Sequence, residues 1–335
     1  MDGELGKFYD AIENPRASRN ELPILRGEEL RTYMREVRER TLEVLENADV
    51  ENDAEDPRMR DGFVYEMLIA HEHQHNETML QLLQMVDGYV PPVLGDVPAA
   101  RGETGLVPGE MLLIPGGLCR IGAPAGGFAY DNERPQHEVE LADFFIDRAA
   151  VTNGEFAEFV AETGAEPPLY WARDDDGWVS TTFGRRAPLD PAAPVVHVDH
   201  TQATAFAAHA GKRLPTELEW EMAAGGADPE LANLDHESFE PLRPSDDPRA
   251  ESTWDARAML GDVWEWTSSD FEAYPGFEPF PYPEYSEVFY GDGYKVLRGG
   301  SWATRRNVVR TTFRNWDLAE RRQIFAGFRC ARDAE

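Results

Sequence analysis

The hydrophobic periodicity of the chain changes near residue 88. Between Glu28 and Glu46, apolar residues recur every three or four positions, which predicts an amphipathic helix. The segments that precede and follow residues 71–79 contain no glycine or proline. A second, longer helix is therefore predicted from about Asp61 to Val86. Because an up-and-down bundle usually has four helices, residues 1–88 predict an incomplete helical domain.

The second helix carries three histidines within five residues, in the sequence HEHQHNETM. At 100° per residue, His71 and His75 share one face, which we expect to be buried. That face also carries Val64, Leu68, Thr78 and Leu82. His73 points to the opposite side and is expected to be a solvated partner of Glu77, four residues later. Two histidines one turn apart favour a metal site bordered by Gln74, with hydrogen-bonded core histidines as the alternative.

His71-Glu72-x-x-His75 also fits the zinc-protease pattern, in which Glu72 would be the general base. The extended form of that pattern needs glycine and histidine where Thr78 and Gln81 stand. The other form needs a glutamate on a following helix, whereas a proline-rich linker follows here. The context therefore argues against a peptidase.

A linker rich in proline and glycine is predicted at residues 89–107, and the pattern after it is one of short strands, turns and a few short helices. Thr152 and Glu155 have the spacing of a capping box, which predicts the start of one of these helices. The fold class predicted is therefore α+β, with a helical domain over residues 1–88 and a mixed domain over residues 108–335.

Composition narrows the choice of partners and compartment. Acidic residues number 63 against 32 basic ones, only three of which are lysine, and the net charge of −31 argues against nucleic acid as a partner. Such a carboxylate-rich surface suits a halophile's cytoplasm, where salt screens the self-repulsion. The only cysteines are Cys119 and Cys330, and no stretch is long and apolar enough to span a membrane. We therefore expect a cytoplasmic protein without membrane or nucleic-acid partners.

The mixed domain contains, in order, the segments MLLIPGG, NERPQHEVELADFFIDRAAVTNGEFAEFV, GKRLPTELEWEMAAGG, MLGDVWEWTSS, VLRGGSW and AGFRCARD. Together they resemble the formylglycine-generating-enzyme or sulfatase-modifying-factor domain, which has a C-type-lectin-like α+β fold, over about residues 108–333. The preceding His71-x-x-x-His75-x-Glu77 helix resembles a DinB-like domain. This combination resembles the sulfoxide synthases of ergothioneine biosynthesis, also called hercynine oxygenases.

The resemblance implies an enzyme with non-haem iron(II). Such enzymes use O2 to join the sulfur of γ-glutamylcysteine, or of cysteine in some branches, to the imidazole C2 of hercynine (Nα-trimethylhistidine). The resemblance also implies that three histidines bind the iron, and two of them match His71 and His75. No histidine precedes His71 in the chain, although the first ligand of the family lies upstream. We therefore expect that the start of the helical domain is missing, and that the chain as given is poorly soluble and nearly inactive.

The resemblance also assigns residues to the thiol substrate. Arg16 and Arg19, in the sequence RASR, match arginines that bind its carboxylate, whereas their spacing alone predicts only a solvated basic turn. Asp317 and Arg321 match positions close to the same substrate.

Positions around hercynine are matched by Gln74, Asn315 and Trp316. An aromatic wall such as Trp316 suits a trimethylammonium group. Tyr282 matches the active-site tyrosine, whose hydroxyl can deliver a proton or hydrogen atom. The match crosses an aromatic-rich loop of variable length, so Tyr274 and Tyr285 are alternatives.

Two other functions compete with this interpretation. A formylglycine-generating oxidase needs a copper-binding cysteine pair near the C-terminal end, where only Cys330 stands. A non-catalytic, lectin-like binding relative with a decayed iron site is the second alternative.

Overall fold

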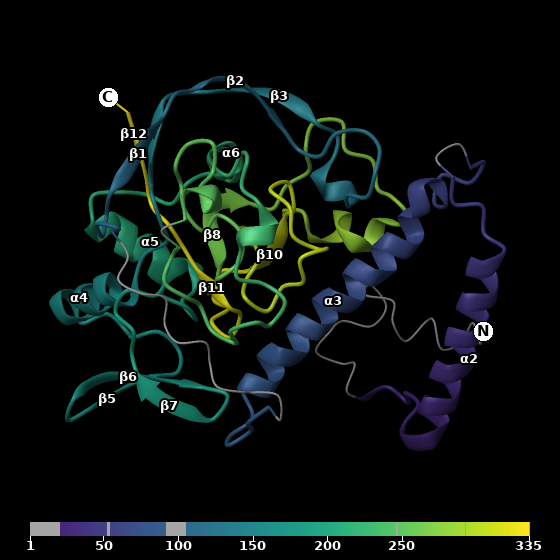
Figure 1. The fold of residues 1–335 in the computed structure, drawn as a ribbon, viewed down its shortest axis with the longest axis horizontal. Coiled ribbons are helices and arrows are strands. Elements are labelled where there is room, and N and C mark those ends of the chain that lie inside the picture. Colours follow the sequence, from purple (N-terminus) through teal and green to yellow (C-terminus); the bar gives the residue numbers. More distant parts are fainter. Residues whose placement is uncertain (1–20, 52–53, 92–104, 246, 292, 335) are drawn as a thin grey trace.

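The structure, a computed structural model, describes residues 21–51, 54–91, 105–245, 247–291 and 293–334. Two long helices come first: α2 spans Gly27–Glu46 and α3 spans Phe63–Gln84. Three shorter helices follow in the C-terminal part, residues 105–334. These are α4 (Asn153–Thr163), α5 (His200–His209) and α6 (Glu217–Ala223). Figure 1 shows α3 lying across the C-terminal part while α2 stands apart on its outer side.

Short strands form four sheets among the described residues. The first has the order β1-β4-β12 (Met111–Ile114, Phe144–Asp147, Ala331–Asp333). The second has the order β10-β9-β8-β11 (Asn315–Leu318, Tyr294–Arg298, Trp264–Asp270, Ala326–Gly327). The others are β2-β3 (Gly117–Ile121, His137–Leu141) and β5-β6-β7 (Trp171–Asp174, Gly177–Thr182, Arg185–Pro188). The predicted α+β class is confirmed.

Local signals in the sequence place the helices of the C-terminal part. Thr152 caps α4 and accepts a hydrogen bond from the backbone N–H of Glu155, as the capping-box spacing predicts. The helix ends at Gly164, whose φ of 72° lies in the left-handed region that glycine adopts easily. None of the described helices combines the length and apolar character needed to cross a bilayer.

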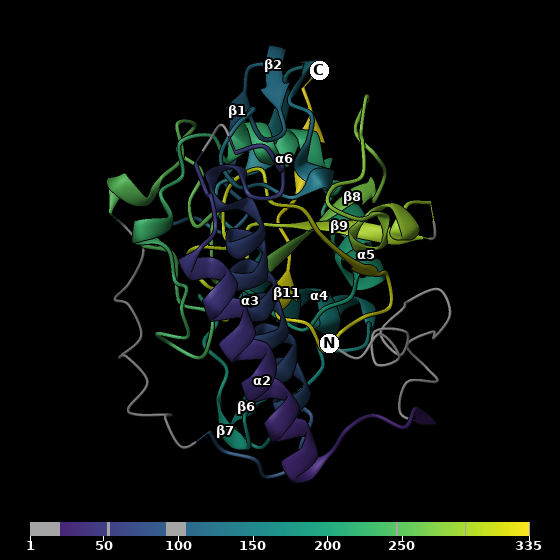
Figure 2. The ribbon, with the colours of Figure 1, turned by 90° about the vertical axis from the view of Figure 1, so that its right-hand side faces the viewer.

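Helix α3 is held against the C-terminal part by one apolar stripe. Phe63, Met67 and Ala70 are buried, and the ring of Phe63 packs against Phe128 and Phe280 at centroid distances of 5.4 and 4.8 Å. Burying side chains the size of Phe and Met stabilises the docked helix by about 1.5–3 kcal/mol each. The predicted long helix is confirmed, and Figure 2 shows it from the side that carries α2.

The predicted buried face of α3 is wrong. Leu68 and Leu82, which share the face of the two histidines, are 46% and 60% exposed, and His75 is exposed as well. The C-terminal part packs instead against the stripe of α3 that carries Phe63 and Met67. This stripe is offset from the predicted face by the rotation of about one residue around the helix axis. Both stripes are apolar, so hydrophobicity alone could not choose between them.

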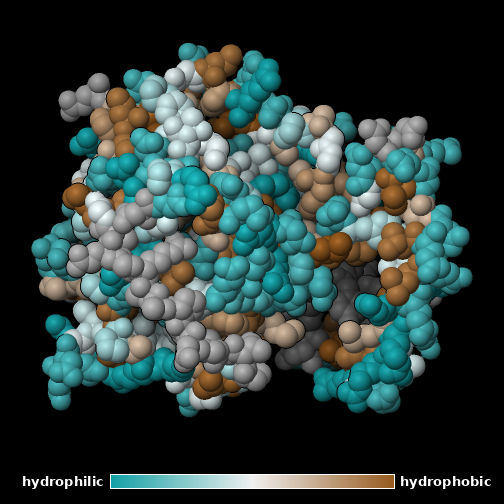
Figure 3. All heavy atoms as spheres, viewed as in Figure 1, coloured by the Kyte–Doolittle hydropathy of each residue, from teal (hydrophilic) through white to brown (hydrophobic). Residues whose placement is uncertain are grey.

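An apolar surface remains exposed on both long helices. Helix α2 buries none of its residues, and its exposed large hydrophobic residues include Met34, Val44 and Leu45. On α3 the exposed ones include Leu68, Met79 and Leu82. In Figure 3, hydrophobic residues are visible between hydrophilic ones on this side of the molecule. Exposed apolar surface of this kind favours association or aggregation.

His197 gives the C-terminal part a dependence on pH. Burial lowers the pKa of this imidazole from 6.5 to about 4, although backbone carbonyls of Arg322 and Ile324 oppose the shift. Since the unfolded chain binds the proton more readily, this contribution to stability is complete above pH 6.5 and is lost as the pH falls towards 4. At pH 5 the loss should be about 2 kcal/mol.

The comparison of the wild-type protein with His197→Gln isolates this effect. Lowering the pH from 7 to 5 should reduce the free energy of unfolding of the wild type by about 2 kcal/mol more than that of His197→Gln. Urea unfolding at both pH values measures the difference. Parallel stability curves for the two proteins would contradict the assignment.

Candidate functional site

A buried carboxylate fixes the rotation of α3. Glu77 accepts hydrogen bonds from Trp264 Nε1 at 2.7 Å, Ser301 Oγ at 2.8 Å and Thr304 Oγ1 at 2.7 Å. Burial raises the pKa of Glu77, while the three donors lower it. The predicted solvated pairing of His73 with Glu77 is therefore wrong, because these contacts take the carboxylate into the C-terminal part.

The two histidines of the predicted metal site lie together on α3. The ring centres of His71 and His75 are 4.5 Å apart, and the rings are tilted by 54°. A cation about 2.1 Å from one nitrogen of each ring fits between imidazoles this close. The pKa of His71 is lowered, first by burial and then by the charge of His75, so the neutral, metal-binding form is favoured.

This pair would supply two of the three ligands that the family resemblance implies. Within the part of the chain that the structure describes, no three His, Cys, Asp or Glu side chains are grouped to hold a metal ion. The donor set of His71 and His75 therefore fits part of an iron site. It does not complete one by itself.

Gln74 connects the histidine helix with two tyrosines of the C-terminal part. Tyr130 O–H donates to Gln74 Oε1 at 3.1 Å, and the hydroxyl of Tyr285 lies 3.4 Å from Oε1 and 3.3 Å from Nε2. The rings of Tyr130 and Tyr285 stack with centres 4.2 Å apart. Burial raises the pKa of both phenols, so both remain hydrogen-bond donors at neutral pH.

An aromatic wall continues from this cluster to β10. Tyr285 lies between His71 and Trp316, with ring centres 6.4 and 5.8 Å away and nearly perpendicular planes. On its other side, Trp316 stacks on Phe271 at 4.2 Å. The ring of Trp316 is thus held in place beside Tyr285, which itself lies beside His71.

Asn315 and Gln74 line one small cavity between α3 and the C-terminal part. Its volume is about 70 Å³, and Glu77 and Thr304 are also in its wall. Asn315 Oδ1 accepts the backbone N–H of Trp316 at 3.0 Å, which leaves the amide NH2 of Asn315 to bind other groups. Gln74 and Asn315 thus line the same cavity, and Trp316, the neighbour of Asn315 on β10, is linked to Gln74 through Tyr285.

A buried ion pair holds the start of β10. Arg314, which precedes Asn315, donates to both carboxylate oxygens of Glu217 at 2.7 and 2.8 Å. At the other end of the strand, Asp317 and Arg321 form a looser ion pair at 3.5 Å. Asp317 and Arg321 are both residues that the resemblance matched to the thiol substrate. Arg16 and Arg19, matched to the same substrate, lie outside the described residues.

The three candidate tyrosines have different surroundings. Tyr285, at the end of the short helix η6 (Pro283–Tyr285), is the one beside His71. Tyr282, the matched residue, precedes this helix and is 36% exposed. Tyr274 is buried, and its hydroxyl lies 3.4 Å from Glu217 Oε2 under the guanidinium of Arg314. The structure therefore brings Tyr285 against the predicted site, leaves Tyr282 at its border and ties Tyr274 into the ion-pair network.

The loop that carries Tyr285 is fixed by the segment that carries Tyr130. Asp131 accepts hydrogen bonds from the hydroxyl of Ser286 and from the backbone N–H of Phe280. Asn132 Nδ2 donates to the same hydroxyl at 3.0 Å. The aromatic-rich loop is therefore packed and hydrogen-bonded at this end.

Sequence reasoning missed Tyr130. It stands two residues before the segment NERPQHEV, in which the resemblance was noted, and no periodicity singles it out. Its contacts with Gln74 and Tyr285 join residues that are 56 and 155 positions away in the chain. Only the fold shows them.

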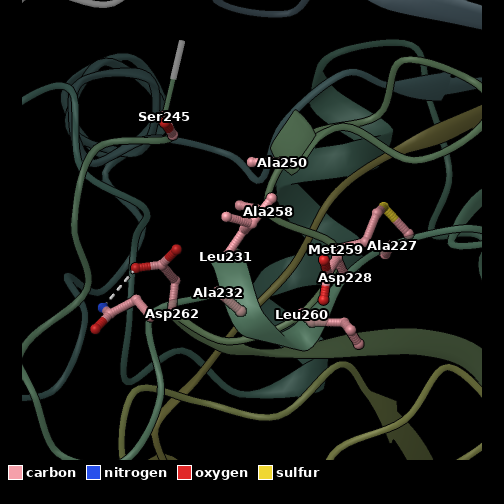
Figure 4. Close-up of a pocket in the computed structure, with 11 residues that line it drawn as sticks. Ala227, Asp228, Leu231, Ala232, Ser245, Ala250, Ala258, Met259, Leu260 and Asp262 are labelled. Carbon is pink, nitrogen blue, oxygen red and sulfur yellow. Dashed lines mark hydrogen bonds between the residues drawn. The ribbon is translucent and has the colours of Figure 1, made fainter. Parts of the chain in front are cut away.

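A second cavity, shown in Figure 4, does not compete with this site. Its volume is about 20 Å³, and Asp262 in its wall accepts a hydrogen bond from Asn233 Nδ2 at 2.7 Å. Such a space holds a single water molecule. It is lined mainly by Ala, Leu and Met side chains that belong to the packing around α6.

Comparisons with known proteins place this arrangement in context. Residues 99–334 match the "Sulfatase-modifying factor enzyme 1-like domain". The chain is 40% identical to the hercynine oxygenase of Mycolicibacterium smegmatis over 369 residues, covering 98% of this chain and 84% of the relative. It is 29% identical to ergothioneine biosynthesis protein 1 of Schizosaccharomyces pombe, over 62% of this chain and 28% of that protein. The solved structure of PvdO from Pseudomonas aeruginosa is 24% identical, covers 67% of this chain and 94% of its own, and superposes with a TM-score of 0.53, which shows a shared fold.

Proposed function

The chain belongs to the sulfatase-modifying factor enzyme 1-like family and, within it, to the hercynine oxygenases, and from this we propose that it couples hercynine to a thiol with O2. The sulfur of γ-glutamylcysteine or cysteine would bond to the imidazole C2. The ring loses its C2–H and the thiol its S–H. One oxygen atom goes to the sulfur as the sulfoxide, and the other leaves as water. The product would be an intermediate of ergothioneine biosynthesis.

The proposal rests on one arrangement in the structure. Next to the histidine pair lies a cluster formed by Gln74, Tyr285 and Trp316. The partly exposed ring of Trp316 would offer an aromatic face to a trimethylammonium group, which cation–π attraction stabilises by about 0.5–2 kcal/mol. The Gln74 amide can hydrogen-bond the imidazole ring. The free NH2 of Asn315 can bind the carboxylate. Hercynine carries all three of these groups.

Iron(II) would be held by His71 and His75, with further positions left for other ligands. When bound, it supplies the activation of O2 that the coupling needs. The half-buried His71 and the aromatic cluster next to it limit the access of water on one side. The protein's own task is then to orient the imidazole C2 and the sulfur towards each other.

The thiol substrate brings one or more carboxylates into a chain of net charge −31, so it needs arginines to receive it. Arg16 and Arg19 would supply charge-assisted hydrogen bonds, each contributing about 1.5–3 kcal/mol. Arg16→Ala should therefore raise the KM for γ-glutamylcysteine about tenfold or more and leave the KM for hercynine nearly unchanged. Steady-state kinetics with one substrate varied at a time measures both constants. An unchanged KM for the thiol would remove Arg16 from the site.

The two tyrosines of the loop should divide two tasks. Tyr285 is half-buried and its hydroxyl is tied to the Gln74 amide, so it is suited to bind hercynine. Tyr282 is 36% exposed, so its hydroxyl can recover a proton from solvent and is suited to deliver one during C–S bond formation. We expect Tyr285→Phe to raise the KM for hercynine about threefold to tenfold and to change kcat little.

Tyr282→Phe should do the reverse. Both substrates should still bind, while sulfoxide formation falls about 100-fold or more and O2 is diverted to oxidation of the thiol alone. Product and oxidised thiol are measured together by chromatography. Equal sulfoxide rates in Tyr282→Phe and the wild type would move the proton-delivering role to Tyr285.

Oxygen uptake tests the proposed function as a whole. Protein supplied with iron(II) should consume O2 above the background rate only when hercynine and a thiol are both present, even if the rate is low. Omitting either substrate, or replacing hercynine by histidine, should reduce the rate strongly. Uptake that does not depend on hercynine would refute the proposal.

The cysteines argue against a formylglycine-generating oxidase. Cys330 is buried, and burial raises the pKa of its thiol well above the usual range, which keeps it from acting as a thiolate ligand. Cys119, the only other cysteine, lies on β2 at the surface hairpin and is partly exposed. Copper held by a cysteine pair has no support in this arrangement.

A further inference from the structure

A further cavity, of about 410 Å³, lies between the sheet β5-β6-β7 and the loops at residues 190–197 and 240–243. Its volume falls within the range of about 300–1,000 Å³ that is typical of small-molecule sites. None of the residues in its wall belongs to the histidine site. Figure 1 shows this sheet at the end of the C-terminal part that lies opposite β2 and β3. The proposed function therefore leaves this cavity unused.

The register of the sheet decides which of its side chains face the body of the C-terminal part. Trp171 on β5 is buried in the core and is paired with Ser180 on β6. Paired residues stand on the same face of a sheet and the face alternates along each strand, so Thr182 and its partner Arg185 share this face. All four residues line the cavity. The sheet thus presents one guanidinium and two hydroxyls on its inner face.

The arginines in the wall of the cavity differ in their pairing. Arg243 donates to both carboxylate oxygens of Asp190, at 2.8 and 2.9 Å, and Arg186 pairs with Asp174 at 3.4 Å. Arg185 is half-buried and forms no ion pair or hydrogen bond with another described residue. Acidic residues outnumber basic ones by 63 to 32, and yet this guanidinium has no carboxylate partner in the described part of the chain. It is therefore available to an anionic group of a ligand.

Glu240 is the corresponding acidic residue in the same wall. Its backbone carbonyl is held by Asn233 Nδ2 at 3.0 Å and by the hydroxyl of Ser238. Its half-buried carboxylate makes no ion pair or hydrogen bond with another residue that the structure describes. Burial raises the pKa of Glu240, while the charge of Arg185 lowers it, so the two charges influence each other although they do not form an ion pair. Two opposite charges kept apart in one cavity match a ligand that carries both charges itself.

We propose that this cavity binds an α-amino acid with a large apolar or aromatic side chain. The carboxylate of the ligand would accept hydrogen bonds from the guanidinium of Arg185 and from the hydroxyls of Ser180 and Thr182. The ammonium group would donate to Glu240. The ligand's side chain would lie against the apolar part of the wall, which includes Leu169, Tyr170, Pro194, Val196 and Leu242. This site lies apart from the histidine pair, so the proposal does not depend on the proposed function.

Calorimetric titration into the full chain tests which groups of the ligand are recognised. The wild type should bind L-phenylalanine or L-leucine at one site per chain, with a Kd below about 1 mM. Phenylpropionate lacks the ammonium group and phenylethylamine lacks the carboxylate, so each should bind about tenfold or more weakly than L-phenylalanine. Glycine, which has no side chain to bury, should bind weakly as well. Failure of both amino acids to bind, or equal affinities for L-phenylalanine and its two analogues, would overturn the proposal.

Substitution of each charged residue should affect only the ligands that carry the opposite charge. Arg185→Gln and Glu240→Gln should each weaken L-phenylalanine about tenfold to 100-fold. Arg185→Gln should leave phenylethylamine unaffected, and Glu240→Gln should leave phenylpropionate unaffected, a pattern that a general disturbance of the fold would not give. Arg186→Gln is the matched control, because it removes the same charge from the opposite face of the same strand. Its affinity for L-phenylalanine should stay within about twofold of the wild type.

Two other results would contradict the proposal. Binding of L-phenylalanine that survives Arg185→Gln and Glu240→Gln but is lost in Gln74→Ala would place the amino acid in the histidine site. Urea unfolding of the two single variants and the double variant without ligand gives the second test. Equal losses of stability in all three would show that Arg185 and Glu240 pair with each other and are not available to a ligand. We expect unfolding midpoints close to that of the wild type in all three variants.

Discussion

Replacing His75 by alanine is expected to lower the affinity of the protein for iron(II) about 100-fold or more. The two imidazoles of α3 are the proposed metal-binding pair, with ring centres 4.5 Å apart, and one of them alone does not chelate a metal ion. Loss of a residue that only supports a ligand already costs about tenfold to 100-fold in metal affinity, and loss of a ligand should cost more. Metal analysis after anaerobic loading with iron(II) and dialysis measures the effect.

His73→Ala is the matched control for this experiment. His73 lies on the same helix, two residues from His75, but it interacts with Arg305 and Asp235 of the C-terminal part. Its replacement should leave iron binding within about twofold of the wild type. If His75→Ala retained as much iron as His73→Ala, α3 would not be the metal-binding element. A zinc-loaded protein that cleaves peptides with the help of Glu72 would also contradict the assignment.

Glu77→Ala is expected to destabilise the protein by about 3 kcal/mol or more and to release α3 from the C-terminal part. The change would leave the donors of Trp264, Ser301 and Thr304 buried without an acceptor. Each unsatisfied buried donor costs about 1–3 kcal/mol. Urea unfolding gives the loss of stability, and hydrogen exchange of the α3 amides shows whether the helix separates before the rest unfolds.

Glu72→Ala provides the control on the same helix. Glu72 is exposed, so its replacement should change the free energy of unfolding by less than about 0.5 kcal/mol. Similar midpoints for Glu77→Ala and Glu72→Ala would show that the buried carboxylate does not anchor α3. Protection of the α3 amides in Glu77→Ala equal to that of the wild type would lead to the same conclusion.

The sequence predicted the elements of the fold better than their contacts. Helix α3 and the cap at Thr152 depend on neighbouring residues, and both are confirmed. By contrast, which face of α3 is buried does not depend on residues that are close to it in the sequence. Its partners Trp264 and Ser301 lie 187 and 224 positions away from Glu77, and they favour the stripe of the carboxylate over the stripe of Leu68.

The histidine pair was predicted from the helical pattern, and the rest of the candidate site was predicted by resemblance. The structure brings Gln74, Asn315 and Trp316 together, although nothing in the local sequence connects α3 with β10. Tyr282 and Tyr285 are separated by a single short turn, so a sequence match across a loop of variable length cannot decide which of them faces His71. Tyr130 contributes through its hydroxyl, which contacts Gln74, and through its ring, which stacks on Tyr285, at a position where the fold brings it to both. No local signal records such a contact.

The fate of isotopically labelled oxygen tests the central claim most directly. Protein with iron(II) is given hercynine, γ-glutamylcysteine or cysteine, and 18O2, and the product is analysed by mass spectrometry. The account predicts one product that contains both substrates joined through sulfur at the imidazole C2, with a single 18O atom on the sulfur. Recovery of unchanged hercynine, with the 18O found only in oxidised thiol or water, would contradict it.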